Sequence, residues 1–561
     1  MNTRTRLFFP ILLAGSIALS ACGVAAPYAP TPIAIAPLPG LGDNSRPAAA
    51  PTAAPARPTA APKPANGAPS IAPINPPVYA PPQSEAAGRA PIPPASALPV
   101  RPAPTATPAG PIDNRFRDAG VNPWTDAARD HLSTFAVDVD TASYDIARRY
   151  LKDGQLPPYD AVRVEEFVNA FKPGYGLPKD VAFALYADGA PSPFHGQGTV
   201  LLRFGVQGGQ PELRLRKSAS YVFVVDVSGS MATDNRMGLA KDALKMLVSR
   251  LGPNDTVGIV AFTNTAREVL YPTTASNQYA INSALDSLRP ENATNVQKGL
   301  ELGYQMAYKS YRADSNNRMF LLSDGVANEG GLTPEAILQS VGEYASKGIQ
   351  LHSIGVGFGN YNDTLMEKLA DKGNGQYVYI NNAGDAEKLV AEKFASFQTI
   401  ALDAKTQVEF NPDTVVSYRL LGYENRAVAD SDFRNNNAGG GGIGAGRSAV
   451  ALYAVQLRPG AQGRIATLQL RWQDPANRDW KELNGNVNTW DIKKSYEEAP
   501  AQFRLAATVA QFAEILRQSP YAREWPLWDI ATRADGLRGE LREDSDVAVF
   551  ADLARQAATI R

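Results

Sequence analysis

Apolar and polar positions change along residues 220–397 in a regular way. Short apolar runs rich in β-branched residues have the length and composition of buried strands. Longer stretches between them repeat their apolar positions at helical spacing. The expected strands cover 221–226, 256–262, 318–323, 350–356 and a shorter segment near 376–380, and the expected helices cover 236–250, 277–288, 296–309, 334–346, 362–371 and 385–398. This alternation is typical of a doubly wound, Rossmann-like α/β domain with a mostly parallel sheet covered on both faces.

The segments on both sides of this α/β region are richer in strand-like patterns and predict flanking β-rich (α+β) regions. Before it, we expect strands at 132–139, 181–186 and 200–206, a helix that begins at Thr141 or Ser143, and a helix at 163–171; after it, we expect strands at 406–410, 414–420, 449–457 and 464–472 and helices at 501–517 and 547–560. The Gly/Asn-rich stretch 435–446 predicts a mobile loop. Because domain ends commonly lie close together, we infer that the strands of both flanks pair into one β-sandwich, with the α/β domain inserted between its halves.

The amino terminus has the organisation of a bacterial secretion signal. Arg4 and Arg6 precede an apolar stretch of about fifteen residues, which is shorter than a membrane-spanning helix and fits a signal peptide. The sequence Leu-Ser-Ala-Cys-Gly at 19–23 resembles the lipoprotein processing box. We therefore expect residues 1–21 to be removed and Cys22, the only cysteine, to carry a lipid that anchors the chain to a bacterial membrane on its extracytoplasmic side. The alternative is an ordinary secretory signal with an incidental cysteine.

Residues 22–112 form a proline- and alanine-rich stretch. They hold 25 of the 44 prolines in the chain and few charges, so they cannot bury a core or sustain helices and sheets. We expect a semi-extended tether that lifts the folded body away from the membrane. The rest of the chain then divides into an N-terminal flanking α+β region at 113–217, the α/β domain at 218–398 and a C-terminal β-rich region with terminal helices at 399–561.

The overall composition excludes some functions. The formal net charge is −1 and the pI is near 6.4, so no nucleic-acid partner is expected. The three histidines, His131, His195 and His352, are widely separated in the sequence, which argues against a histidine-rich zinc site. A single cysteine excludes an intramolecular disulfide.

Candidate chemistry gathers at the end of the strand expected at 221–226. Asp226, Ser228 and Ser230 follow one another at alternate positions, with Gly229 in the turn between them. Ligands of open α/β sheets bind at the carboxyl ends of the strands. One carboxylate and two hydroxyls make an oxygen-only site, which suits a hard divalent cation such as Mg²⁺. The turn therefore predicts metal-dependent binding more than catalysis.

This motif resembles the Asp-x-Ser-x-Ser signature of the von Willebrand factor A (VWA) domain and its metal-ion-dependent adhesion site. Thr294, before the helix at 296, and Asp324, after the strand at 318–323, resemble the other two loops of that site. The resemblance implies that Ser228, Ser230 and Thr294 bind Mg²⁺ directly, with Mn²⁺ or Ca²⁺ as alternatives. Asp226 and Asp324 would act mainly through water. One coordination position would be left for a carboxylate of a protein partner.

One loop departs from the family pattern. The family often has Gly-Gly-Thr or Gly-x-Thr there, whereas this chain has Glu291-Asn-Ala-Thr294. The loss of glycine restricts the loop, and Glu291 is a candidate competing ligand. Without the resemblance, the same Ser, Thr and Asp residues would be interpreted as helix caps and turn residues. The flanks, in turn, resemble a bacterial family of VWA lipoproteins in segments 133–144, 148–149, 162–166, 421–426 and 503–516.

The sequence favours a surface-tethered binding protein that holds an acidic group of its partner through Mg²⁺. The alternative is a structural scaffold in envelope assembly, with a secondary or vestigial metal site. An enzyme is a third hypothesis, because Asp138-x-Asp140 is loosely similar to a phosphatase nucleophile motif. The glycine-rich surroundings of that motif are missing, so we expect a capping or hydrogen-bonding role and no catalysis. Arg148-Arg149, and Arg163 with Glu165-Glu166, are expected to form solvated pairs or interdomain salt bridges.

Overall fold

The computed structural model describes residues 116–178, 181–210, 217–291, 294–325, 334–357, 363–393 and 399–560, which belong to one structural unit. The signal peptide, Cys22 and the proline-rich tether lie outside the described residues. Expectations for those segments, and for the domain boundaries, stay predictions. Within the described part of the chain, no helix is both long and apolar enough to cross a membrane.

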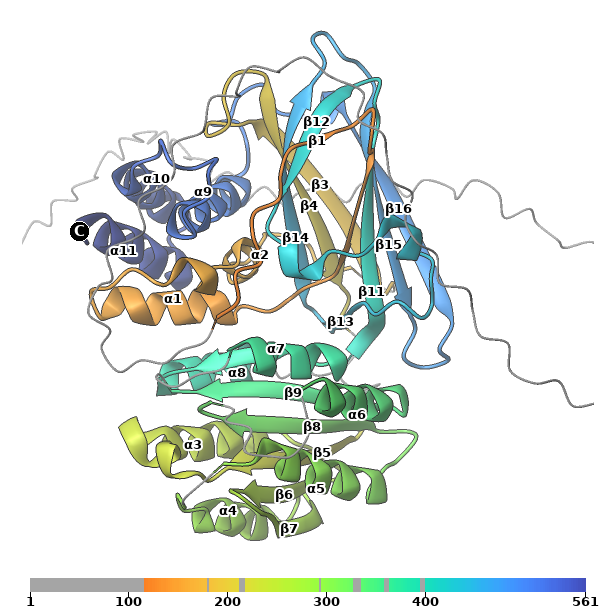
Figure 1. Ribbon diagram of the computed structural model, residues 1–561, viewed down its shortest axis with the longest axis vertical. Helices are drawn as coiled ribbons and strands as arrows, with labels where there is room; N and C mark the ends of the chain where they lie inside the picture. The colour runs from red at the N-terminus through yellow and green to blue at the C-terminus, as the bar shows by residue number, and fades with distance from the viewer. Residues whose placement is uncertain are drawn as a thin grey trace, which may run out of the picture. The chain divides into compact units, whose positions relative to one another are not determined.

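A six-stranded sheet forms the centre of the α/β domain (Figure 1). Its strands lie in the order β10-β9-β8-β5-β6-β7. All neighbours pair in parallel except β7, which pairs antiparallel with β6 at the edge. The bounds are β5 Ala219–Asp226, β6 Thr256–Phe262, β7 Ala266–Thr274, β8 Asn316–Ser323, β9 Ile349–Val356 and β10 Tyr377–Ile380. The predicted doubly wound, mostly parallel sheet is confirmed, and β7 is an addition to it.

Helices cover both faces of this sheet, and β5 shows why its sequence is apolar throughout. Tyr221, Phe223 and Val225 belong to a buried cluster with α3, α4 and α8, whereas Val222 and Val224 belong to another with α5, α6 and α7. Successive side chains of a strand point to opposite faces, so a strand covered on both sides has no polar face. The helix bounds are α3 Arg236–Ser249, α4 Gln278–Ser287, α5 Val296–Lys309, α6 Pro334–Ser346, α7 Asp363–Lys372 and α8 Ala383–Lys393.

The flanking segments form two antiparallel sheets with a common core (Figure 1). One sheet contains β1 Thr125–Asp126, β12 Val415–Leu421, β14 Ser448–Leu457, β4 Thr199–Gly208 and β3 Phe183–Pro191, in that spatial order. The other contains β13 Gly441–Gly444, β11 Thr399–Phe410, β15 Arg464–Gln473 and β16 Trp480–Asn488, with β2 Leu132–Ala136 also paired to β11. Phe410 of the second sheet stacks on Tyr418 of the first, with ring centroids 4.1 Å apart. Interlocking aromatic side chains of this kind fill the space between the two sheets.

Strands from before and after the α/β domain share both sheets. β4 pairs with β14, from Gln207↔Ser448 to Thr199↔Gln456. β2 pairs with β11 in the other sheet. The α/β domain is therefore inserted in the sequence between β4 and β11, two strands of one sandwich. This confirms the prediction that the flanking strands pair with each other around an inserted domain.

Two local predictions in the flanks were wrong. The stretch 435–446 is not wholly a loop, because Gly441–Gly444 forms β13 against β11. A Cβ at Gly441 would lie 1.8 Å from the carbonyl oxygen of Val137, so only glycine permits this close backbone approach. The strand expected at 132–139 ends at Ala136, and Asp138 in the segment that follows pairs with the guanidinium of Arg426.

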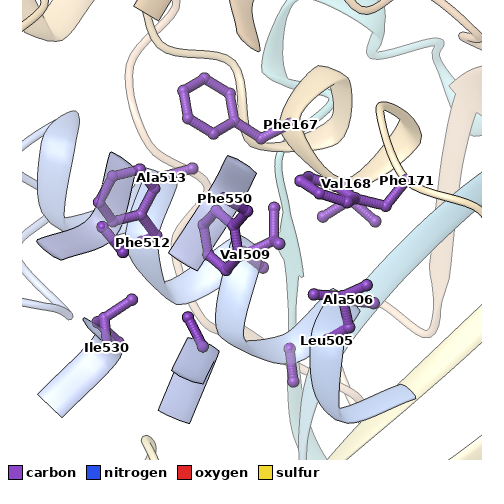
Figure 2. Close-up of a cluster of buried hydrophobic side chains, with 14 of the residues drawn as sticks. Phe167, Val168, Phe171, Leu505, Ala506, Val509, Phe512, Ala513, Ile530 and Phe550 are labelled. Carbon is purple, nitrogen blue, oxygen red and sulfur yellow. The ribbon is translucent and has the colours of Figure 1, made fainter. Parts of the chain in front are cut away.

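Five helices and part of the first sheet enclose a third core. The helices are α1 Ala142–Lys152, α2 Val164–Asn169, α9 Ala501–Leu516, α10 Leu527–Glu540 and α11 Ser545–Thr559. Figure 2 shows Phe167, Phe512 and Phe550 meeting there from α2, α9 and α11. The ring centroids of Phe512 and Phe550 are 5.5 Å apart in an edge-to-face arrangement, which aromatic pairs prefer. The sequence predicted α1, α2, α9 and α11, with shifts at their ends, but not α10.

Helix α1 joins this third core to the α/β domain. Its residues Tyr144, Ala147 and Leu151 pack with the helical core, whereas Ile146 and Tyr150 pack with the cluster of α5, α6 and α7. Both sides of α1 are therefore buried. Thr141 occupies the N-cap position of α1, as predicted for one of two candidates, although its side chain makes no capping hydrogen bond.

Candidate metal site

Four of the five predicted metal-binding residues lie together at one edge of the parallel sheet. Asp226 is the last residue of β5, and Asp324 directly follows the neighbouring parallel strand β8. Ser228 and Ser230 lie between β5 and α3, at the start of a short 3-10 segment, Gly229–Asn235. Because the carboxyl ends of parallel strands meet at one edge, residues almost 100 positions apart come into contact.

A chain of hydrogen bonds connects these four residues. The carboxylate oxygen Oδ1 of Asp226 accepts from the backbone N–H of Ser228 at 2.8 Å. The hydroxyl oxygens of Ser228 and Ser230 are 3.0 Å apart, and the Ser230 hydroxyl donates to Oδ1 of Asp324 at 2.9 Å. Asp226, Ser228 and Asp324 are buried. Their oxygen atoms are therefore held in place by the surrounding structure.

The donor set fits a hard divalent cation. Adjacent ligands of an octahedral Mg²⁺, with metal–oxygen distances of about 2.0–2.1 Å, are about 3 Å apart. The hydroxyl and carboxylate oxygens of this cluster have the same separation, 2.9 and 3.0 Å. Within the described residues, no group of three or more His, Cys, Asp or Glu side chains could hold a metal ion. A metal at this edge would therefore depend on serine hydroxyls as well as carboxylates.

Thr294 is positioned by the backbone of its loop. The N–H of Glu291 donates to the carbonyl oxygen of Val227, and the N–H of Asn295 donates to that of Thr263 at 2.7 Å. These two bonds hold Glu291 and Asn295, on either side of Thr294, beside the ends of β5 and β6. Thr294 itself is partly buried. Its role as a metal ligand stays a prediction.

The carboxylate of Glu291 is directed elsewhere. It lies 2.8 Å from the guanidinium of Arg267 on the surface, and both side chains are about half exposed. This ion pair argues against the hypothesis that Glu291 competes for the metal. Residues 292–293, where the family often has glycine, lie outside the described part of the chain.

Two polar residues beside the site were not predicted from the sequence. Ser323, the last residue of β8, donates its hydroxyl to Oδ2 of Asp226 at 2.6 Å. Arg236, the first residue of α3, places Nη1 2.6 Å from Oδ2 of Asp324. Both residues are buried. The only signals in the sequence were a serine next to Asp324 and an arginine just after the serine loop, and neither belongs to the Asp-x-Ser-x-Ser signature.

Burial dominates the electrostatics of the two carboxylates. Burial raises the pKa of Asp226 to about 6, while hydrogen bonds from Ser323 and Ser228 oppose the shift. Burial also raises the pKa of Asp324, and Arg236 and Ser230 oppose that shift. Keeping both carboxylates charged in a desolvated site costs free energy. A bound cation would offset that cost.

The acidic pair considered for catalysis lies elsewhere, in a buried set of ion pairs. Oδ2 of Asp138 is 2.9 Å from Nε of Arg426, and Oδ2 of Asp140 is 3.3 Å from Nη2 of Arg426. Oδ1 of Asp140 accepts from the backbone N–H of Tyr377 in β10. These bonds connect both flanks to the α/β domain. They match the hydrogen-bonding role expected for the pair.

The basic residues of the N-terminal flank form both kinds of ion pair that were expected. Arg149 and Asp153 make an exposed pair within α1. Arg163 instead makes a buried pair with Glu367 of α7, in the α/β domain, at 2.9 Å. Arg148 lies 3.6 Å from Asp385 of α8.

Comparison with known proteins matches three parts of the chain to families. Residues 222–392 match the model for the von Willebrand factor type A domain, and residues 111–203 match a model described as von Willebrand factor. Residues 395–560 match the model described as "Uncharacterized protein YfbK, C-terminal". The three matches cover the α/β domain and both of its flanks.

Individual proteins are similar over different lengths. YfbK of Escherichia coli (strain K12) is 34% identical over 460 residues, which is 77% of this chain and 79% of YfbK. Protein sll0103 of Synechocystis sp. is 28% identical over 286 residues, 49% of this chain and 66% of that protein. A solved structure, "von Willebrand factor type A from Catenulispora acidiphila", has 17% sequence identity and a TM-score of 0.42, covering 65% of this chain and 88% of that chain. From the extent of the similarity to YfbK, the chain belongs to the YfbK family of bacterial proteins with a von Willebrand factor type A domain.

Proposed function

We propose that this chain binds a protein partner through a divalent cation, Mg²⁺ in the first instance, held at the carboxyl edge of its VWA sheet. The ligands would be Asp226, Ser228, Ser230, Thr294 and Asp324, and a carboxylate of the partner would complete the coordination. The observation that supports this best is the convergence of two buried carboxylates and two serine hydroxyls with oxygen separations near 3 Å. Mg²⁺ keeps water ligands readily and gains from an added anionic ligand.

A binding role agrees with the family. VWA domains generally mediate protein–protein interactions, and this chain contains one at residues 222–392. The acidic pair Asp138 and Asp140 is engaged with Arg426 and is buried, so it offers no accessible nucleophile. We therefore propose that the protein is not an enzyme. A hydrolase activity that disappears in Asp138→Asn, in a variant that remains folded, would contradict this part of the proposal.

The anchoring of the protein is a separate part of the proposal. Cys22 follows a signal-like segment in a lipoprotein-type box, and the proline-rich residues 23–112 separate it from the folded body. We propose a lipid on Cys22 and an extracytoplasmic location on a bacterial membrane. Growth with an alkyne-labelled fatty acid should label the wild-type chain and leave Cys22→Ser unlabelled. Equal labelling of both proteins would refute lipidation at Cys22.

Metal binding can be tested on the full chain in detergent. We expect Mg²⁺ or Mn²⁺ to bind with one site per chain in calorimetry, and Asp226→Asn to lose this binding. Asp242→Asn in α3 is a matched control, because it changes the net charge equally at an exposed position on the same domain. Equal metal binding by wild type and Asp226→Asn would refute the assignment of the site.

Partner capture separates the binding hypothesis from the scaffold hypothesis. Wild type, Asp226→Asn and Asp242→Asn would be cross-linked in intact cells with and without a chelator. A metal-dependent partner should be captured by wild type and Asp242→Asn, and lost from Asp226→Asn and after chelation. Partners that are captured equally in every sample would favour a scaffold with a secondary metal site.

A further inference from the structure

Arg236 places a positive charge directly beside the candidate metal site. Its Nη1 lies 2.6 Å from Oδ2 of Asp324 and 3.4 Å from the carbonyl oxygen of Ser230. The other oxygen of Asp324 accepts from the Ser230 hydroxyl. The Asp324 carboxylate is thus shared between a guanidinium and the predicted metal donors. Arg236 is only 5% exposed, so solvent screens this pair weakly.

The surrounding backbone is adapted to this arginine. A Cβ at Gly357, which follows β9, would lie 2.6–2.8 Å from three side-chain atoms of Arg236, and Gly357 has a φ of +75°. Arg236 is also the first residue of α3. A cation is unfavourable at a helix N-terminus, because the peptide dipoles are positive there. The bond to Asp324 offsets this cost, so the carboxylate accounts for the position of the arginine better than the helix does.

We propose that Arg236 is a built-in counter-cation of this site and weakens its affinity for a divalent metal. The inference rests on the proposed function, because it assumes that the cluster of Asp226, Ser228, Ser230 and Asp324 binds metal. In the metal-free protein the guanidinium neutralises Asp324. A divalent cation bound to the same carboxylate would be repelled by that guanidinium, or the guanidinium would have to give up its bond. Either way, Arg236 makes the free energy of metal binding less favourable.

A partner carboxylate would reverse this disadvantage. An added anion attracts the metal, and it also offers Arg236 an acceptor when Asp324 is engaged. Metal and acidic ligand should therefore strengthen each other's binding, and the effect must be reciprocal. The site would fill mainly in the presence of an acidic partner, which makes the metal part of the recognition and not a permanent structural ion.

The test measures Mn²⁺ binding to the full chain by calorimetry, in detergent, without and with acetate as a simple carboxylate. Arg236→Gln removes the charge, and Arg236→Lys keeps it. Arg250→Gln is the matched control, because it makes the same charge change at an exposed position about 20 Å away at the other end of α3. We expect Arg236→Gln to bind Mn²⁺ roughly tenfold more tightly than wild type. Arg236→Lys and Arg250→Gln should stay within about threefold of wild type.

Acetate provides a second measurement, and its effect on wild type does not depend on how well the Gln variant folds. It should tighten Mn²⁺ binding in wild type and Arg236→Lys more than in Arg236→Gln. If wild type binds Mn²⁺ and Arg236→Gln binds it equally or more weakly, this inference is overturned and the proposed function stands. No effect of acetate on wild type also overturns it. If neither wild type nor any variant binds Mn²⁺, the proposed function fails, and this inference fails with it.

Discussion

Arg163, the residue just before α2, and Glu367 of α7 form a buried ion pair, with 2.9 Å between Nη2 and Oε2. The pair joins the N-terminal flank to the VWA domain. The same Glu367 carboxylate lies 3.4 Å from Nη2 of Arg426, which comes from the C-terminal flank and also binds Asp371 of α7. Two arginines therefore tie both flanks to one helix of the inserted domain. Three sequence segments that resemble the lipoprotein family, at 133–144, 162–166 and 421–426, contribute to this set of ion pairs.

Removing Arg426 should destabilise the protein strongly. Arg426→Gln leaves Asp138, Asp140 and Asp371 without their shared guanidinium in a buried place. Loss of one partner of a buried ion pair costs about 3–5 kcal/mol, because the remaining charge stays desolvated. Urea unfolding followed by intrinsic fluorescence would measure this. Arg434→Gln is the control, since Arg434 is exposed and should contribute less than about 1 kcal/mol. Similar midpoints for the two variants would contradict the role given to Arg426.

Glu165 should make the stability depend on pH. One oxygen of its carboxylate accepts from the backbone N–H of Tyr423 at 2.9 Å, and the other is buried without a hydrogen-bond partner among the described residues. Burial, followed by repulsion from Glu424 and Asp138, raises the pKa of Glu165 from 4.5 to about 7. The folded state therefore holds this proton more tightly than the unfolded state. The stabilisation is complete below pH 4.5 and is lost as the pH rises through 7.

The variant Glu165→Gln removes this titration. Between pH 5 and pH 8, the free energy of unfolding of wild type should fall relative to that of Glu165→Gln by up to about 3 kcal/mol. Urea unfolding at several pH values gives the difference directly. Glu268→Gln, at an exposed position in β7, should show no such trend against wild type. A constant difference between wild type and Glu165→Gln across this range would show that Glu165 titrates normally.

The fold could be predicted where the burial of an element determines the pattern of its local sequence. Strand β5 is apolar throughout because both of its faces are covered. Strand β7 was missed because it lies at the edge of the sheet and exposes charged residues such as Arg267 and Glu268, so its apolar run is only three residues long, at 269–271. Helix α10 buries Ile530, Ala534 and Leu537 at helical spacing, but its small residues and two internal glycines weaken that signal.

The sequence motif of the candidate site could be predicted, but the residues that surround the motif in the fold could not. Asp226, Ser228 and Ser230 are close in sequence, and Asp324 follows a strand that could be recognised. The contact of Arg236 with Asp324 depends on how α3 enters beside β8, which no local pattern specifies. Strand β13 is a similar case. Its glycines favour a loop locally, and they form a strand only because β11 offers a pairing edge.

The core of the terminal helices should depend on Phe512. This side chain is fully buried, and its ring contacts those of Phe167 and Phe550 (Figure 2). Phe512→Ala should lower the free energy of unfolding by about 3–5 kcal/mol, because it removes apolar contacts and leaves a cavity. Trp528→Ala on α10 is the control, since 53% of Trp528 is exposed. Chemical unfolding of the two variants should give clearly different midpoints. Equal losses would argue against a well-packed core at Phe512.

Ser323 should support the metal site through Asp226. Its hydroxyl donates to Oδ2 of Asp226 at 2.6 Å in a buried position. Ser323→Ala removes a hydrogen bond to the charged form of the carboxylate, so the pKa of Asp226 should rise further above about 6. A metal must then displace a proton from Asp226 over a wider pH range. Mn²⁺ binding by Ser323→Ala should therefore be weakened more at pH 6 than at pH 8, relative to wild type.

Two further observations separate this effect from general damage. The free energy of unfolding of Ser323→Ala should fall by about 1–3 kcal/mol, the cost of a buried carboxylate that loses one donor. Ser346→Ala removes a serine hydroxyl that donates to a helix carbonyl at an exposed position, and it should change neither stability nor Mn²⁺ binding appreciably. If the loss of Mn²⁺ affinity in Ser323→Ala is the same at pH 6 and pH 8, then Ser323 positions Asp226 without adjusting its protonation, and the electrostatic part of the argument fails.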